Sequence, residues 1–470
     1  MPNGKDRDKE KTKEVKEPKD SKDVKKVNDD ELERQIYYHG MRPRKEVTTL
    51  LKQSGSWLVR MTDKDGTLML VLSYHDPVKG IRHLTLESAN KRWSLNALRK
   101  NKKKKCKDFA SVVELIEFYK NDKTELQLGT PVDRPQWMIK HDQLSFDRTK
   151  DLLGTGNFAN VYKGIYKIDD KMEKIVAIKE SITREAYTVE QLKKERESML
   201  KEAETQVYYV HENVVRFFGV AADYPPIQVV MELCPGRDLM THLQREKDNI
   251  SVAERIVYIR DAARGMVYLH DEKNLLHRDI AARNCLIAAN GYIKISDFGL
   301  SLLCEKKESI DIDEPGNHQL PVRHMAPETL KKPAIYSKKS DVWAFGMLIY
   351  EVFNNGVKPW PEDQPRKIAT KIRRCEMCPL PENMPQDIKK LVKEDIWQTK
   401  AEARPSIKDT LMRVERQYRL IGKPEKPVIQ REASLSRSKS MSISNDEYTQ
   451  NDEVTVTEEV KKTSENTKRN

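Results

Sequence analysis

Residues 277–284 read His277-Arg278-Asp279-Ile280-Ala281-Ala282-Arg283-Asn284, and residues 297–299 read Asp297-Phe298-Gly299. Between them, Tyr292-Ile293-Lys294-Ile295 has the pattern of a short strand. A carboxylate that can accept a proton and two further oxygen ligands therefore stand in loops beside apolar strand segments. A purely structural loop rarely carries these groups in this order and spacing.

This pattern resembles the catalytic loop and the magnesium loop of protein kinases, in the Ala-Ala-Arg form of tyrosine kinases. The resemblance implies that Asp279 accepts the proton of a substrate hydroxyl group. It also implies that Asn284 and Asp297 bind the Mg²⁺ ions that neutralise the phosphates of ATP. We therefore expect ATP and Mg²⁺ as cofactors.

Further kinase motifs follow the expected order along the chain. Residues 153–161 resemble the glycine-rich loop, in which Gly154 and Gly156 let the backbone approach phosphate, while Ala159 replaces the third glycine. Lys179 closes Val176-Ala177-Ile178-Lys179 and is the expected phosphate ligand. The nucleotide-binding residues that the resemblance implies are Leu153, Gly154, Gly156, Val161, Ala177, Lys179, Glu202, Met231, Glu232 and Asp297.

The glutamate partner of Lys179 should come from a helix predicted over 189–203. We choose Glu202 because it stands nine residues before His211, where a segment similar to the family's His-Pro-Asn-Ile-Val begins. Glu195 and Glu197 are the alternatives.

Tyrosine specificity is implied by the position of one cation. Ala281 stands where serine/threonine kinases have a lysine, and Arg283 supplies the positive charge two residues later. This leaves room for a longer phenolic acceptor. Pro321–Met325 resembles the platform that carries the acceptor peptide, with His324 in place of the usual tryptophan.

Two other features resemble the kinase scaffold. Ala326-Pro327-Glu328 closes the activation segment, and Arg404 is the expected buried partner of Glu328. The run that begins Asp341-Val342-Trp343 predicts a long apolar helix.

Upstream, Tyr37–Glu46 and the strand-like Gly55–Arg60 resemble an SH2 domain. Arg60 should be buried at the end of this strand, and a phosphate dianion suits such an arginine. Arg44 and His83 are the other expected phosphotyrosine contacts. The family's Arg-Glu-Ser is Arg60-Met61-Thr62 here, so a serine of the phosphate loop is displaced or lost. A second helix is expected at Phe109–Tyr119.

An SH2 domain followed by a kinase resembles the Fes/Fer group of non-receptor tyrosine kinases. The expected fold class is α+β: an SH2 domain with a central antiparallel sheet flanked by two helices, then a bilobal kinase fold. Since the group's N-terminal membrane-bending domain has no counterpart in the sequence, we expect a short form. The expected segments are 1–35 (charged, disordered), 36–130 (SH2), 131–145 (linker), 146–416 (tyrosine kinase) and 417–470 (disordered, rich in Ser and Thr).

Composition limits where the chain acts. It has 470 residues, a net charge of +12 and six cysteines, and neither an apolar signal sequence nor a run long enough to cross a membrane, so we expect a reduced, cytoplasmic protein. The sharpest charge cluster is Arg99–Lys107. It is either a solvated loop or a contact with the inner face of the plasma membrane. Because no stacking aromatics accompany it, we expect no nucleic-acid partner.

The activation segment departs from the group. No tyrosine lies between Gly299 and Pro321, and Asp311 stands where the group's tyrosine would be, with Asp313 and Glu314 close by. Either a carboxylate pairs with Arg278 and orders the segment permanently, or the acidic loop is simply exposed.

Two functions fit these motifs. The first is an active protein-tyrosine kinase that is recruited to phosphotyrosine-containing proteins and phosphorylates tyrosine in protein substrates. The second is a phosphotyrosine-binding scaffold whose kinase fold is inactive. The presence of every group that the chemistry needs favours the first, and Ala281 with Arg283 disfavours a serine/threonine kinase.

Overall fold

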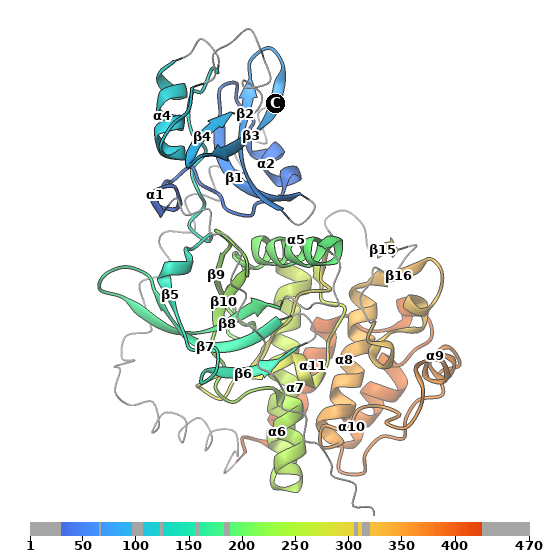
Figure 1. The fold of residues 1–470 in the computed structure, drawn as a ribbon. Coiled ribbons are helices and arrows are strands. Elements are labelled where there is room, and N and C mark those ends of the chain that lie inside the picture. Colours follow the sequence, from blue (N-terminus) through green and yellow to red (C-terminus); the bar gives the residue numbers. More distant parts are fainter. Residues whose placement is uncertain are drawn as a thin grey trace, which may run out of the picture. The chain divides into compact units, whose positions relative to one another are not determined.

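The computed structural model describes residues 30–64, 67–95, 107–122, 126–156, 159–182, 189–304, 309–312 and 320–424. The chain divides into two compact units (Figure 1). Unit 1 runs to Lys140 and includes Ala222–Pro225, and unit 2 comprises His141–Ala221 and the chain from Pro226 onward.

Unit 1 is built on one antiparallel sheet in the order β1-β2-β3-β4. The first four residues of β1, Trp57 to Arg60, are all buried, so this strand is covered on both faces. The sheet and its flanking helices confirm the expected SH2 fold. The elements are α1 (Asp30–Glu33), α2 (Arg44–Leu50), β1 (Trp57–Lys64), β2 (Thr67–Asp76), β3 (Gly80–Ala89), β4 (Arg92–Leu95) and α4 (Val112–Asn121).

Two boundaries in unit 1 differ from the sequence prediction. Strand β1 continues four residues beyond Arg60, to Lys64. Helix α4 begins at Val112, three residues later than predicted. The side chain of Ser111 accepts a hydrogen bond from the Glu114 amide at 3.1 Å and so caps the helix there. Phe109 instead pairs its backbone with Trp93.

The N-terminal part of unit 2 is a six-stranded antiparallel sheet with one long helix. Its order is β5-β7-β8-β10-β9, and β6 pairs with β7. Strand β8 lies between β7 and β10, so a residue near its centre is supported from both sides. The elements are β5 (Leu144–Ser145), β6 (Leu152–Thr155), β7 (Ala159–Lys167), β8 (Glu173–Ser181), α5 (Val189–Gln206), β9 (Phe217–Ala221) and β10 (Gln228–Glu232).

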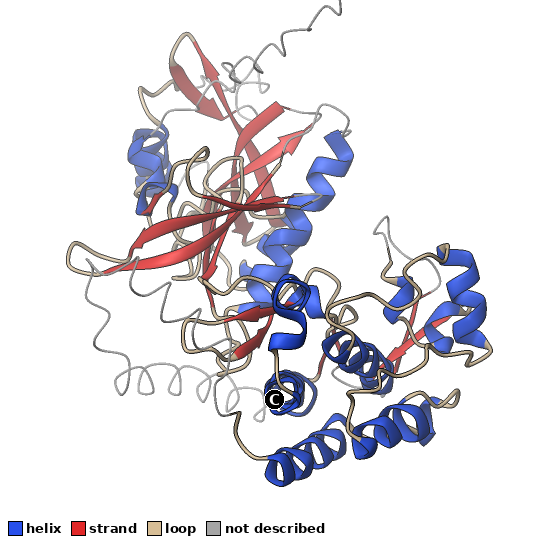
Figure 2. Ribbon diagram, turned by 90° about the horizontal axis from the view of Figure 1, so that it is seen from below, coloured by secondary structure: helices blue, strands red, loops and turns tan. Residues whose placement is uncertain are grey.

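The rest of unit 2 is mainly helical, as Figure 2 shows. The helices are α6 (Leu239–Glu246), α7 (Val252–Val267), α8 (Lys338–Phe353), α9 (Pro365–Arg373), α10 (Gln386–Lys390) and α11 (Ile407–Ile421). Short strands form pairs: β11 (Leu275–Leu276) with β14 (Leu302–Leu303), β12 (Cys285–Ile287) with β13 (Ile293–Ile295), and β15 (Ser309–Ile312) with β16 (Ala334–Ser337). Single turns are η1 (His141–Gln143), η2 (Lys247–Asn249), η3 (Tyr268–Glu272), η4 (Ala282–Asn284), η5 (Val322–His324), η6 (Pro327–Leu330), η7 (Leu391–Ile396) and η8 (Ala401–Ala403).

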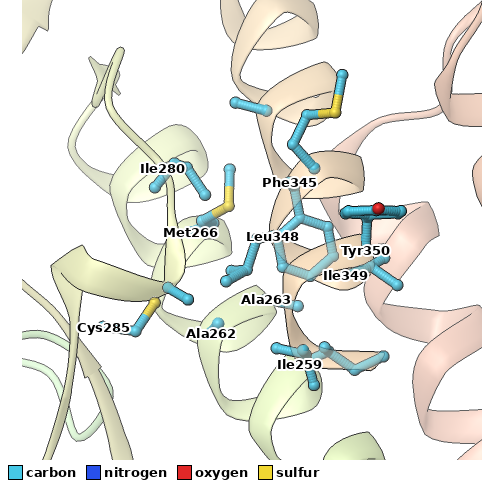
Figure 3. Packing of buried hydrophobic residues seen from close by; sticks show 14 of the residues in the cluster. Ile259, Ala262, Ala263, Met266, Ile280, Cys285, Phe345, Leu348, Ile349 and Tyr350 are labelled. Atoms are coloured by element: carbon cyan, nitrogen blue, oxygen red, sulfur yellow. The ribbon is translucent and has the colours of Figure 1, made fainter. Parts of the chain in front are cut away.

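The main core of unit 2 lies around α7 and α8. Figure 3 shows Ala262 and Met266 of α7 near Leu348 of α8, with Ile280 and Cys285 beside them. Ile280 directly follows Asp279, Cys285 directly follows Asn284, and both are 1% exposed. Packing of these two side chains in the core therefore fixes the loop next to Asp279 and next to Asn284.

The predicted pair between Arg404 and Glu328 is confirmed. Two parallel hydrogen bonds of 2.7 and 2.8 Å join the guanidinium to the carboxylate. The arginine is 1% exposed, and its guanidinium lies 4.9 Å from the centre of the Trp343 ring. This pair ties the end of the activation segment to the turn before α11.

Within the described ranges, no helix is long and apolar enough to cross a membrane. The basic segment Arg99–Lys107 lies outside those ranges except for Lys107, whose ammonium is 4.0 Å from the Phe118 ring centre.

Candidate active site and anion pocket

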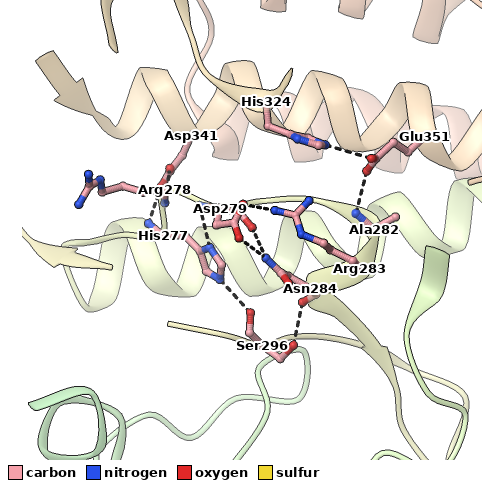
Figure 4. A network of polar contacts seen from close by, with 10 residues as sticks. All are labelled: His277, Arg278, Asp279, Ala282, Arg283, Asn284, Ser296, His324, Asp341 and Glu351. Carbon is pink, nitrogen blue, oxygen red and sulfur yellow. Dashed lines mark hydrogen bonds and ion pairs between the residues drawn. The ribbon is translucent and has the colours of Figure 1, made fainter. Parts of the chain in front are cut away.

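Three predicted catalytic residues lie together on and beside turn η4 (Figure 4). The side-chain nitrogen of Asn284 donates to the Asp279 backbone oxygen at 2.7 Å and to its Oδ2 at 2.8 Å. Arg283 donates to the other carboxylate oxygen, Oδ1. The Asp279 carboxylate is therefore held by two donors in one orientation.

Asp341 on α8 fixes the backbone of the catalytic loop. This residue was not assigned to the site from the sequence. Its carboxylate accepts the amides of His277 at 2.7 Å and Arg278 at 2.9 Å. Burial alone would raise the pKa of Asp341, but the hydrogen bond from His270 and the nearby histidines hold it below its ordinary value. Arg278 has a left-handed backbone with φ of +69°. Asp341 stabilises this strained turn.

The second predicted metal ligand, Asp297, lies near Lys179. The Lys179 ammonium is 3.6 Å from the Asp297 carboxylate. This charge lowers the pKa of Asp297 against the opposing effect of burial, so the group stays ionised. Just before Asp297, Ser296 donates its amide to the Asn284 carbonyl at 2.9 Å. The two loops predicted to bind metal are thus joined by backbone.

Most of the predicted nucleotide residues lie on the six-stranded sheet or at its strand ends. Val161 of β7 is opposite Lys179 of β8, and Ala177 of β8 is opposite Met231 of β10. Leu153 of β6 is 43% exposed. Gly154 has open space where a Cβ would stand, and the Gly156 amide donates to the Ala159 carbonyl at 2.8 Å, which closes the hairpin.

Two observations on this surface go beyond the sequence prediction. The carboxylate of Glu232 forms an ion pair with Lys294 at 3.0 Å. The side chain of Glu232 therefore has a structural role, and a nucleotide would contact its backbone groups. Leu286, which was not predicted, packs with Met231 in one apolar cluster. Its position two residues after Asn284 was the only signal in the sequence.

The glutamate partner of Lys179 stays a prediction. Glu202, Glu195 and Glu197 all lie on α5. The side chains of Glu202 and Glu195 fall outside the described part of the structure, and Glu197 is exposed.

The proposed pairing of Asp311 with Arg278 is wrong. Asp311 is exposed on β15 opposite Ile335 of β16, and no ion pair between these two described residues exists. The Arg278 guanidinium instead lies 4.0 Å from the Tyr336 ring centre and donates to the Leu300 carbonyl at 3.0 Å. Strand pairing and an aromatic ring, rather than a charge, fix this part of the segment. Asp313 and Glu314 lie outside the described residues.

Unit 1 contains a buried cation. Arg60 is 3% exposed, and its guanidinium donates to the Ser73 hydroxyl at 3.3 Å and the Arg42 carbonyl at 3.4 Å. No carboxylate lies within ion-pair distance of it among the residues described. Burial, with a smaller contribution from the charge of Arg44, lowers the pKa of Arg60 to about 10. A buried guanidinium without a counterion favours binding of an anion.

The other two predicted phosphotyrosine residues lie around Arg60. His83 on β3 is bonded through Nδ1 to the same Ser73 hydroxyl at 2.9 Å. Burial, then the charges of Arg44 and Arg60, lower the pKa of His83 to about 4, so it is neutral at physiological pH. Arg44 is exposed at the first position of α2. Ser73, which connects Arg60 and His83, was not predicted.

The comparisons with known proteins agree with both units. Residues 148–414 match the family described as "Protein tyrosine and serine/threonine kinase", and residues 37–119 match the SH2 domain family. The chain belongs to this kinase family. The expected combination of an SH2 domain with a tyrosine kinase domain is confirmed.

Its relatives include Fer and Fer-related kinases. The chain is 32% identical over 391 residues to human "Tyrosine-protein kinase Fer". This alignment covers 82% of this chain and 44% of the relative. It is 31% identical over 392 residues to "Fer-related kinase 1" of Caenorhabditis elegans, covering 80% of this chain and 92% of the relative. "Spermatocyte protein spe-8" of the same nematode is 32% identical over 330 residues, or 69% of this chain and 60% of the relative. The chain thus spans less than half the length of the mammalian relatives.

Proposed function

We propose that the chain is a protein-tyrosine kinase that transfers the γ-phosphate of ATP to tyrosine in proteins, and that its SH2 unit brings it to phosphotyrosine sites. The observation that carries the catalytic part is the geometry of Asp279. Its carboxylate is held by Arg283 and Asn284, and its backbone lies in a loop that Asp341 anchors. A proton acceptor held in one orientation lowers the entropic cost of the reaction.

In the proposed reaction, the phenolic oxygen of the acceptor attacks the γ-phosphorus. The bond to the oxygen that bridges the β- and γ-phosphates breaks, and ADP leaves with that oxygen. The phenolic proton passes to Asp279 Oδ1 or Oδ2. Lys179 and Arg283 supply positive charge where the phosphates carry negative charge.

Protein kinases use a divalent metal with ATP, and the donors here fit Mg²⁺. Asp297 is ionised, and Asn284 uses its side-chain nitrogen for Asp279, which leaves the amide oxygen to face a cation. Mg²⁺ is commonly held by one or two such oxygens together with substrate phosphates. When bound, the ion neutralises phosphate charge. No larger cluster of metal-binding side chains occurs in the described residues, in keeping with ligands shared with the nucleotide.

Recruitment rests on Arg60. Among the described residues, the buried guanidinium has neutral partners, Ser73 and a backbone carbonyl, so a phosphate would supply a counterion. Neutral His83 is suited to pack against the phenol ring. We also propose a cytoplasmic location, with contact of the basic segment 99–107 with anionic membrane as a secondary attraction.

A kinase assay tests the catalytic proposal. Purified wild-type chain with ATP and Mg²⁺ should phosphorylate a tyrosine-containing copolymer and leave a serine/threonine substrate unmodified. Asp279→Asn keeps the shape of the side chain but replaces one accepting oxygen by an NH2 donor, so it removes the proton acceptor together with one of the two hydrogen bonds from Arg283 and Asn284. Its activity should fall by at least about 100-fold. Nucleotide binding, measured by a thermal shift, should persist. A wild-type chain that binds nucleotide but makes no phosphotyrosine would instead be an inactive scaffold.

A further inference from the structure

The peptide platform predicted at Pro321–Met325 is joined to the catalytic loop by one buried carboxylate. Glu351, on α8, is 2% exposed. Its Oε1 is 3.0 Å from Nε2 of His324, and its Oε2 accepts the amide of Ala282 at 2.8 Å. In Figure 4, dashed lines join Glu351 both to His324 and to Ala282.

The direction of these hydrogen bonds follows from the chemistry of the groups. An ionised carboxylate only accepts, so Nε2 of His324 must carry the hydrogen. The Ala282 amide is the first of turn η4 and has no partner within that turn. Both donors are buried, His324 at 5% and Ala282 at 0% exposure. Losing either bond would leave a buried polar group without a partner.

The platform has its own anchors on the other side. The Arg323 guanidinium donates to the carbonyls of Pro359 at 2.7 Å and Asp363 at 3.0 Å. Met325 packs in an apolar cluster with Leu276 and Tyr336. Of the platform's polar side chains, His324 is therefore the one that points to the catalytic loop.

We propose that His324 is a positioning residue: through Glu351 it sets the distance between the acceptor platform and the loop that carries Asp279, Arg283 and Asn284. This rests on the proposed kinase function. The relevant property of His324 is an N–H donor on a flat ring. Tryptophan, which the sequence resemblance places at this position, has the same property. The structure thus gives a reason why histidine can stand there.

The test compares His324→Phe, which keeps a flat ring without a donor, with His324→Trp and His324→Gln, which restore an N–H donor. The KM for an acceptor peptide should rise about five- to tenfold in His324→Phe, the change expected for losing a hydrogen bond of about 1–1.4 kcal/mol. The KM for ATP should change by less than about twofold, because the nucleotide residues do not contact His324. The donor-bearing variants should recover most of the peptide KM. Should His324→Phe fail to fold, His324→Met removes the donor with a more adaptable side chain.

A matched control is His242→Phe. His242 is also buried, at 1% exposure, and is bonded to the Tyr258 hydroxyl at 3.0 Å between α6 and α7. It should lose stability without a change in peptide KM. If His324→Phe behaves in the same way, with kcat falling only as folded protein is lost, the positioning role is refuted.

Amide hydrogen exchange gives a readout that does not need activity. Exchange in the segment 277–285 should quicken in His324→Phe and return toward the wild-type rate in His324→Gln. In the background of Glu351→Gln, His324→Phe should add little, because the bridge is already altered. Unchanged exchange together with additive effects would overturn the inference. An inactive wild type that still shows the exchange pattern would refute the kinase proposal alone.

Discussion

The central side chain of each site is charged and fixed in one orientation by hydrogen bonds. Its partners are neutral groups in one site, and a cation and an amide in the other. In the part of the chain that the structure describes, Arg60 bonds to neutral groups, while Asp279 is fixed between Arg283 and Asn284. Such arrangements cost stability in the absence of a ligand, because desolvation is not fully offset. They are therefore the positions where a ligand or a substitution should have the largest effect.

Arg60→Lys should weaken binding of a phosphotyrosine peptide by at least tenfold, or about 1.4 kcal/mol. Lysine keeps the charge but loses the planar fork that meets two phosphate oxygens. Fluorescence anisotropy measures the affinity, and the control is Arg82→Lys, at an exposed arginine on strand β3 of the same sheet. Equal affinity of the wild type for phosphorylated and unphosphorylated peptides would contradict the phosphate pocket.

Acid should destabilise the chain through His39. Burial, opposed by the bond to the Val132 carbonyl, lowers the pKa of His39 to about 4, from an ordinary 6.5. Between these values the unfolded chain binds a proton that the folded chain does not, so stability falls as the pH drops from about 6.5 toward 4 and is unaffected above about 7. His83 acts in the same direction.

His39→Gln keeps a donor for the Val132 carbonyl, which His39 meets at 2.9 Å, but cannot titrate. Denaturant unfolding followed at pH 7.5, 6.5 and 5.5 should therefore show a smaller loss of stability on acidification in this variant. A loss of the same size in both proteins would assign the acid sensitivity to other groups.

The helices and strands explain which parts of the site were predictable from the sequence. The order of the motifs was predicted correctly, since short local patterns carry each motif. The Arg404–Glu328 pair spans 76 residues and was predicted from the family resemblance. Asp341 and Glu351 were missed because each accepts a loop amide that is more than 60 residues away in the sequence. Ser73 was missed because its partner His83 lies on another strand, and no local pattern marks any of the three. The error at Asp311 has the same origin: its place in the sequence is near the expected phosphate, but pairing of β15 with β16 turns it to solvent.

The activation segment should not require phosphorylation of its own. Because Asp311 does not contact Arg278, Asp311→Asn should leave the initial rate within about twofold of wild type. Tyr336→Leu removes the ring beneath the Arg278 guanidinium and should lower the rate several-fold.

Phosphatase-treated enzyme should show no lag in phosphorylating peptide. A lag that disappears after incubation with ATP would show that another phosphorylated residue controls the segment.

The tie between the activation segment and α11 should matter more than pairs at the surface. Glu328→Gln leaves Arg404 buried without its counterion and should lower the free energy of unfolding by about 3 kcal/mol. The matched control is Asp395→Asn, which breaks the half-exposed pair with Arg413 and should cost less than about 1 kcal/mol. Denaturant unfolding followed by tryptophan fluorescence compares them. Equal losses would mean that the buried pair contributes no more than a surface pair.

At the level of the entire chain, a phosphate-binding unit and a kinase unit in one polypeptide predict a preference for substrates that are already phosphorylated once. Binding of a phosphotyrosine to the SH2 unit turns the second encounter into an intramolecular one, with an effective concentration set by the connecting chain. A peptide with one phosphotyrosine and one acceptor tyrosine, joined by a flexible spacer, should have a KM at least about tenfold below that of the same peptide with unmodified tyrosine at both sites. The advantage should vary with spacer length and fall when free phosphotyrosine peptide competes. It should disappear in Arg60→Lys, whereas Arg82→Lys should keep it. An advantage that survives in Arg60→Lys would place recognition of the phosphate away from Arg60, Ser73 and His83.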